Sequence, residues 1–125
     1  MQESTSGYWM KVIIAGSRDV TSLYLVEDAS LMSKFDITEV VSGGARGVDR
    51  LGEIFAEKNG LPVKVFPADW IRFGKSAGHR RNREMAQYAD ALVAVWDGVS
   101  PGTKGMILEM KKPKKPVFIG LVKNK

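Results

Sequence analysis

The chain has no cysteine and only one histidine, His79, among its 125 residues. Without cysteine there are no disulfide bridges, thiol nucleophiles or cysteine-ligated metals, which fits a reducing compartment. A single histidine does not supply the ligand set of a zinc site, so we expect no metal site. No apolar run approaches the ~20 residues that a membrane-spanning helix requires, and nothing at the start resembles a secretory signal. We therefore expect a cytoplasmic protein that has no membrane partner.

The remaining composition is that of an ordinary globular domain, with 44% apolar and 26% charged residues. We expect a single domain over residues 10–125, preceded by a flexible lead-in at residues 1–9. The formal net charge is +5, and most of it lies in two stretches. We interpret the lysine-rich stretch near Pro113 and Pro116 as solvated surface. The arginine-rich stretch from Arg72 to Arg83 contains glycines and lies where cations would meet an anion.

Short apolar runs alternate with segments of helical periodicity, which predicts strands and helices in turn. The predicted strands are 11–15, 39–42, 63–66, 91–96 and 117–122, and the predicted helices are 25–33, 48–56, 79–88 and 103–110. Connections of this length favour parallel pairing with right-handed crossovers. The expected fold is a three-layer α/β Rossmann-like sandwich around a mainly parallel five-stranded sheet. The connection from Pro67 to Gly78 is predicted to be irregular, and its length is typical of a functional loop.

Three turns that carry glycine follow predicted strands, and they point to a ligand site. The turns are Gly16-Ser17-Arg18, Ser42 to Asp49, and Asp97 to Thr103. In a parallel sheet such turns meet at one edge, where backbone amides and helix N-termini can bind phosphate. The candidate ligand-binding residues in these turns are Gly16, Ser17, Arg18, Ser42, Gly43, Gly44, Gly47, Ser100, Gly102 and Thr103.

Five further side chains are considered, and each has a structural alternative. Asp49 either stabilises the N-terminus of its helix or accepts a hydrogen bond from a ribose hydroxyl. Arg81 and Asn82 are predicted to clamp a phosphate, and the alternative is a solvated helix face. Trp70 either stacks on a base or fills the core. His79 is expected to serve as a cap or as a phosphate donor.

The spacing in the second turn excludes two common nucleotide motifs. It lacks the Gly-Lys-Ser/Thr ending of a Walker A loop, and Gly43, Gly44 and Gly47 do not fit Gly-x-Gly-x-x-Gly. Taken together, five segments resemble the SLOG superfamily, and most closely its small YpsA-related members of the DUF2493 type. These segments are Lys11 to Arg18, Val41 to Asp49, Pro67 to Trp70, Gly78 to Met85 and Trp96 to Thr103. The resemblance implies a pocket for a nucleotide or nucleotide derivative, with phosphate on the loops around Gly16, Gly43 and Gly102. Some related domains sense ADP-ribose-like signals, and others bind DNA.

A second resemblance, to the LOG phosphoribohydrolases, bears on catalysis. Arg81 to Met85, Ala89-Asp90 and Gly102-Thr103 follow that family's order, but Met106 stands where the resemblance places the catalytic glutamate. A thioether cannot handle protons or stabilise an oxocarbenium charge as a carboxylate does. Cleavage of a nucleoside 5′-monophosphate at its N-glycosidic bond would then require Glu84, Asp49 or Asp97 instead.

The function that we predict is binding of a nucleotide or nucleotide derivative by a sensor or sequestering domain, and this ligand class includes ADP-ribose-like molecules. The alternatives are LOG-like phosphoribohydrolase activity and single-stranded nucleic-acid binding by the arginine-rich stretch with Trp70. The sequence leaves open whether Mg²⁺ accompanies the ligand and whether the chain forms a homo-oligomer.

Overall fold

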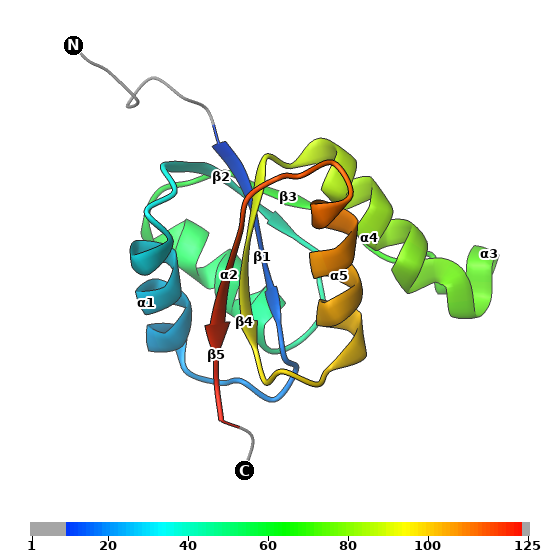
Figure 1. Ribbon diagram of the computed structural model, residues 1–125, viewed down its shortest axis with the longest axis horizontal. Helices are drawn as coiled ribbons and strands as arrows, with labels where there is room; N and C mark the ends of the chain where they lie inside the picture. The colour runs from blue at the N-terminus through cyan, green and yellow to red at the C-terminus, as the bar shows by residue number, and fades with distance from the viewer. Residues whose placement is uncertain (1–9, 124–125) are drawn as a thin grey trace.

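The fold, as a computed structural model describes it for residues 10–123, is a single parallel sheet covered by helices on both faces (Figure 1). Five strands are hydrogen-bonded in the order β3-β2-β1-β4-β5. They are β1 Met10–Gly16, β2 Ile37–Ser42, β3 Val63–Val65, β4 Ala91–Trp96 and β5 Val117–Leu121. This confirms the predicted α/β Rossmann-like class. The predicted lead-in, residues 1–9, lies outside the described residues.

The helices connect successive strands and lie on both sides of the sheet. They are α1 Leu23–Ser33, α2 Val48–Lys58, α3 Trp70–Phe73, the 3₁₀ turn η2 Gly74–Ser76, α4 Ala77–Tyr88 and α5 Pro101–Lys111. Helices α1 and α2 cover one face, and α4 and α5 cover the other (Figure 1). Within residues 10–123 no helix combines the length and the apolarity needed to cross a membrane.

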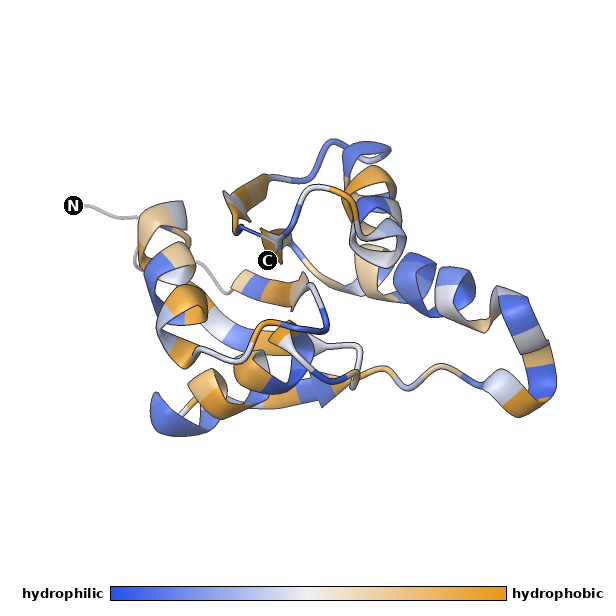
Figure 2. Cartoon of the chain, turned by 90° about the horizontal axis from the view of Figure 1, so that it is seen from below, coloured by the Kyte–Doolittle hydropathy of each residue, from blue (hydrophilic) through white to orange (hydrophobic). Residues whose placement is uncertain are grey.

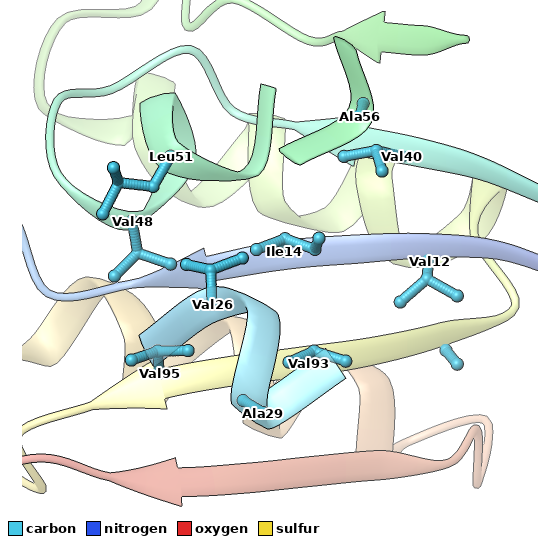
Figure 3. Close-up of a cluster of buried hydrophobic side chains, with 11 residues drawn as sticks. Val12, Ile14, Val26, Ala29, Val40, Val48, Leu51, Ala56, Val93 and Val95 are labelled. Carbon is cyan, nitrogen blue, oxygen red and sulfur yellow. The ribbon is translucent and has the colours of Figure 1, made fainter. Parts of the chain in front are cut away.

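Two apolar cores hold these layers together, one on each face of the sheet. Val12 and Ile14 of β1 face α1 and α2, whereas Ile13 and Ala15 face α4 and α5. Figure 3 shows the first of these cores. β1 and β4 are buried on both faces, as expected for central strands of a parallel sheet. Their carboxyl ends are therefore held rigidly.

The strand order creates a crevice between β1 and β4. From β1 the chain moves outward to β2 and β3, and it then returns to the other side for β4 and β5. The helices that follow β1 and β4 lie on opposite faces of the sheet, so the connections diverge there. Open α/β sheets bind ligands at such a switch point, outside the carboxyl ends of the strands.

The segment from Pro67 to Gly78 is irregular only over residues 67–69, so the prediction is wrong from Trp70 onward. It contains α3 and η2, and α4 begins at Ala77. The Asp69 carboxylate accepts the Arg72 N–H at 3.0 Å, which caps α3, and Gly74 ends α3 at φ +54°. None of the residues of α3 is buried, so no apolar periodicity marks it in the sequence. We call residues 69–80 the arm, because they extend away from the sheet in Figure 1 and in Figure 2.

Candidate functional site

A cavity of about 530 Å³ lies at the carboxyl ends of β1 and β4, within the size range of small-molecule sites. Its walls come from all three glycine-bearing turns, from α4 and from the arm. The predicted site residues that line it are Gly16, Arg18, Asp49, Trp70, Arg81, Asn82, Ser100, Gly102 and Thr103. The convergence of separate segments that the sequence predicts is therefore present in the fold.

A second hollow beside the main cavity is lined by two more of the predicted site residues. Gly43 and Gly44 line this second hollow together with Arg18, Trp70 and Arg81, which it shares with the main cavity. Ser17, Ser42 and Gly47 line neither of the two.

The first turn is packed against β4 and tied to the third turn. A Cβ on Gly16 would lie 1.9 Å from the Val95 carbonyl oxygen, so only glycine fits there. The Ser17 N–H donates to that same oxygen at 3.1 Å, and the Ser17 hydroxyl accepts the Asp97 N–H at 3.0 Å. Ser17 thus joins two turns and has no access to the cavity, which leaves Arg18 to face a ligand.

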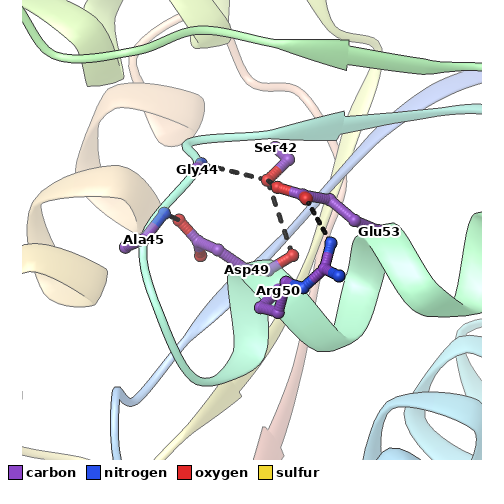
Figure 4. A network of polar contacts seen from close by, with 6 residues as sticks. All are labelled: Ser42, Gly44, Ala45, Asp49, Arg50 and Glu53. Atoms are coloured by element: carbon purple, nitrogen blue, oxygen red, sulfur yellow. Dashed lines mark hydrogen bonds and ion pairs between the residues drawn. The ribbon is translucent and has the colours of Figure 1, made fainter.

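The second turn uses its polar groups internally (Figure 4). The Ser42 hydroxyl accepts the Gly44 N–H at 3.0 Å and donates to Glu53 at 2.7 Å. The Ala45 N–H donates to Asp49 Oδ2 at 3.2 Å. The amides of Gly44 and Ala45 are therefore engaged within the loop, contrary to the expectation that this loop offers its amides to phosphate.

Gly47 has a conformational role in the same turn. Its φ is +76°, and a Cβ there would lie 2.5 Å from backbone atoms of Ser17 and Arg18. Only glycine allows the first and second turns to approach so closely. Gly47 therefore positions Arg18 without contacting a ligand in either hollow.

Asp49 is a carboxylate in the wall of the main cavity, with 7% of its surface exposed. Burial raises the pKa of Asp49 to about 6, although the Ala45 N–H and the Arg81 charge act in the opposite direction. A group with this pKa changes its charge near neutrality. Asp49 is the titratable acid best placed to act on a ligand.

Arg81 is held by neutral oxygens and keeps its charge available. Its Nη1 donates to the carbonyl oxygens of Gly43 and Phe66, and its Nε donates to the Asn82 side-chain oxygen at 3.1 Å. Burial lowers the pKa of Arg81, yet a guanidinium stays protonated at neutral pH. The Asn82 amide donates in turn to the Gly102 carbonyl at 3.3 Å. This chain of contacts fixes α4 against the first turn of α5.

The third turn presents the N-terminus of α5 to the cavity. Asp97 accepts the N–H groups of Val99 and Ser100 at 2.9 and 2.8 Å, and it accepts the Ser100 hydroxyl at 2.6 Å. The Ser100 hydroxyl, followed by these amides, lowers the pKa of Asp97 to about 2. The amides of Gly102 and Thr103 have no hydrogen-bond partner among the described residues. They are the free backbone donors that an anion in the cavity can use.

Trp70 lies on the arm and contributes to both hollows. It is 55% exposed, so the interpretation that it fills the core is wrong. A Cβ on Gly78 would lie 3.6 Å from Trp70 Cη2, which places the indole against the start of α4. His79 also lines the main cavity.

Several residues that line the cavity were not predicted from the sequence. Arg46 and Lys75 add cations, and Ala15, Met85 and Met106 form an apolar part of the lining. Arg46 lies inside the predicted second turn and Lys75 inside the arginine-rich stretch, so position in the sequence was a usable signal for both. The apolar residues cannot be distinguished from core by periodicity. Within residues 10–123 no three acidic or histidine side chains gather as a metal site.

Comparison with known proteins identified a family and solved structures of similar fold. The model of the YspA, cpYpsA-related SLOG family matches residues 10–73, just over half of the chain. No curated protein sequence matches significantly. The structure of DNA processing protein A (DprA) from Streptococcus pneumoniae is similar, with a TM-score of 0.71 and 18% identity. The match covers 89% of this chain and 50% of that chain, so the two share a fold over about half of the longer protein.

Proposed function

The chain belongs to the YspA, cpYpsA-related SLOG family, and from this premise we propose that its main cavity binds a nucleotide or nucleotide derivative. The domain would act as a sensor of that ligand or would sequester it. ADP-ribose-like molecules are included in this ligand class.

The observation that carries the proposal is the convergence of three separate turns on one cation-rich cavity. Four basic side chains line it, against two acidic ones: the bases are Arg18, Arg46, Lys75 and Arg81, and the acids are Asp19 and Asp49. The free amides at the start of α5 are suited to phosphate, and so is the Nη2 group of Arg81, which makes no hydrogen bond within residues 10–123, unlike Nε and Nη1. The proposed phosphate position is therefore between the first turn of α5 and Arg81.

The rest of the lining suits the remainder of a nucleotide. Trp70 offers an exposed aromatic face for a base, and Met85 and Met106 offer apolar contact. A Cβ on Gly102 would meet no atom within 4 Å, so a ligand can approach the backbone of this glycine closely.

The test is a thermal-shift screen of purified protein against nucleoside mono-, di- and triphosphates and ADP-ribose, with and without Mg²⁺. A ligand at about 100 times its Kd adds about 2.7 kcal/mol to the free energy of unfolding, which is a shift of several degrees. Arg81→Gln should abolish the shift. Arg83→Gln is the matched control, because Arg83 is exposed on the same helix and lines neither hollow. Absence of any shift across the screen would contradict the proposal.

One observation favours N-glycosidic hydrolysis as a second candidate. Of the three acids that could replace the missing glutamate, only Asp49 lines the cavity. Glu84 is exposed, and the Asp97 carboxylate is occupied within its own turn. If the protein cleaves AMP, Asp49→Asn should eliminate adenine release while Glu84→Gln leaves it unchanged. Activity that survives Asp49→Asn would reject this mechanism.

The arm supports a third candidate, binding of single-stranded nucleic acid. Arg72 and Arg80 lie 5.1 and 4.3 Å from the Phe73 ring centroid, and with Lys75 they form an exposed group of cations. Binding of an oligonucleotide through these side chains should weaken steeply between about 50 and 200 mM salt. Arg72→Gln combined with Arg80→Gln should then reduce oligonucleotide affinity without changing the nucleotide-induced thermal shift.

A further inference from the structure

Asp49 presents an acceptor to the main cavity that no protein group satisfies. Its Oδ2 accepts the Ala45 N–H, whereas its Oδ1 has no hydrogen-bond partner among the described residues. The residue is 7% exposed and lines the cavity, and its unpartnered Oδ1 is not fully enclosed, so we take Oδ1 to be open to the cavity. An accessible carboxylate oxygen in a cavity wall is a ready acceptor for a hydroxyl or amide that a ligand brings.

Arg81 does not fill this role, although it lies nearby. A Cβ on Gly43 would be 2.8 Å from both Arg81 Nη1 and Asp49 Oδ2, so the two side chains share the space that this glycine leaves open. No ion pair between them is present, because Arg81 donates instead to Gly43 O, Phe66 O and Asn82. The cation and the carboxylate are thus held side by side and both remain available to a ligand.

A bare oxyanion would be attracted by Arg81 and repelled by ionised Asp49. An anion that carries a hydroxyl a few bonds away would satisfy both, because the hydroxyl donates to Asp49 while the anion binds the cations. We propose that Asp49 is the residue through which the cavity selects sugar phosphates with free hydroxyls over anions that lack a hydrogen-bond donor. This inference rests on the proposed function and specifies the ligand class of that site.

Other charged groups around Asp49 bear on how the selection depends on pH. Arg81 on α4 and Arg18 after β1 face it, and Glu53 lies on its own helix. Lys75, His79, Asp19 and Arg46 line the same cavity. When Asp49 is protonated it can donate to a bare anion, so the selection should fade in acid. His79 lines the same cavity, so the pH series is repeated in a His79→Gln variant.

The experiment compares two probes that differ only in hydroxyl groups. Ribose 5-phosphate is titrated against tetrahydrofurfuryl phosphate, which has the same ring and phosphate but no hydroxyl, by calorimetry near pH 8. The wild-type chain should bind ribose 5-phosphate about tenfold tighter or more. In Asp49→Asn the ratio of the two affinities should fall to about twofold or less. Glu53→Gln is the control, because it removes a nearby negative charge that does not line the cavity, and its ratio should stay high.

The outcomes separate this inference from the proposed function. If the wild-type chain binds both probes equally, the role proposed for Asp49 is wrong. The same follows if folded Asp49→Asn keeps the wild-type ratio of affinities. In both cases the proposal that the cavity binds an anion is unaffected. Failure of both probes and of all nucleotides to bind overturns the proposed function as well. If Asp49→Asn does not fold, the ratio of the two affinities is instead followed as a function of pH in the wild-type chain and in the His79→Gln variant. A ratio that falls with acid in the His79→Gln background supports the inference, and a constant ratio contradicts it.

Discussion

Gly16 and Gly102 lie in turns that are predicted to line the same pocket, but the absence of a side chain has a different consequence at each position. At Gly16 a Cβ would lie 1.9 Å from the backbone of β4, whereas at Gly102 it would meet nothing within 4 Å. The first glycine is needed by the fold. Gly102 instead leaves open space beside the N-terminus of α5, and a ligand can occupy that space.

This difference gives a prediction for two matched substitutions. Gly16→Ala should lower the free energy of unfolding by about 3 kcal/mol, because rigid backbone must move to admit the methyl group. Gly102→Ala should leave stability unchanged or raise it by up to about 1 kcal/mol, since alanine is the better helix residue. Urea denaturation measures both. Similar unfolding midpoints for the two variants would contradict the assigned roles.

Asp49 should reduce stability at neutral pH. Its pKa is about 6 in the folded chain and 3.8 ordinarily, so as the pH rises the unfolded chain releases this proton first. Stability is therefore lost between about pH 4 and pH 6, and the loss persists above that range. Asp49→Asn should be more stable than wild type by about 2–3 kcal/mol near pH 8 and nearly equal to it below about pH 4. Chemical denaturation of both proteins at the two pH values tests this prediction. If Asp49→Asn is more stable than wild type by the same amount at both pH values, titration of Asp49 is not the cause of the difference.

At the same scale, the sequence predicts which residues gather but not what each one contacts. Arg18 and Asp49 could be identified because they lie in turns after apolar strands, and such turns meet in a parallel sheet, whereas Arg81 was indicated by the arginine-rich stretch. Ser42 looks like a ligand-binding hydroxyl in the same pattern, yet it bonds Gly44 and Glu53. Spacing along the chain does not reveal which partner a hydroxyl meets, because that depends on side chains brought in by folding.

At the scale of elements, α4 ends in an unusual way. Tyr88 is followed by no glycine, and the Lys115 ammonium donates to the carbonyls of Ala86, Gln87 and Ala89 at 2.7, 3.3 and 2.7 Å. A cation at this position donates hydrogen bonds to carbonyls that have no partner within the helix, and it interacts favourably with the negative end of the helix dipole. The interpretation of the lysine-rich segment as solvated surface is therefore wrong for Lys115.

Lys115→Met should lower the free energy of unfolding by about 1–2 kcal/mol, because three carbonyls at the end of α4, two of them partly buried, lose their donor. Lys112→Met is the control, since Lys112 is 67% exposed and only pairs with Glu109 on the surface. That variant should change stability by less than about 0.5 kcal/mol. Chemical denaturation compares them, and equal effects would show that the three carbonyl contacts contribute nothing.

The sequence predicts long elements well and the arm poorly. β4, Ala91–Trp96, could be predicted at both ends because its continuous apolar run is typical of a strand covered on both faces. The arm offers no such signal, since α3 buries none of its residues and Ile71 is completely exposed. Only the Asp69 cap and Gly74 mark it, and such local signals occur in many loops.

At the scale of the whole molecule, the main cavity joins two parts of unequal rigidity. One wall, with Gly16 and Asp49, belongs to the sheet edge and α2, which are packed into the core. The other wall, with Trp70 and Lys75, belongs to the arm, whose helix α3 has no buried residue. Segments with few buried apolar contacts open locally at low free-energy cost. A ligand that touches both walls should therefore hold the arm against the sheet.

Hydrogen exchange can test this coupling with any nucleotide that passes the thermal-shift screen. Amides of residues 69–80 should exchange rapidly in the free protein. Exchange should slow by up to about 100-fold when the nucleotide is present at about 100 times its Kd, because opening the arm then requires releasing it. The last turn of α1, residues 31–33, lies on the opposite face of the sheet and should be unaffected, which makes it the internal control. A nucleotide that stabilises the protein but leaves exchange in the arm unchanged would mean that Trp70 and Lys75 take no part in binding, and the ligand would then have to lie against the sheet edge and α5 alone.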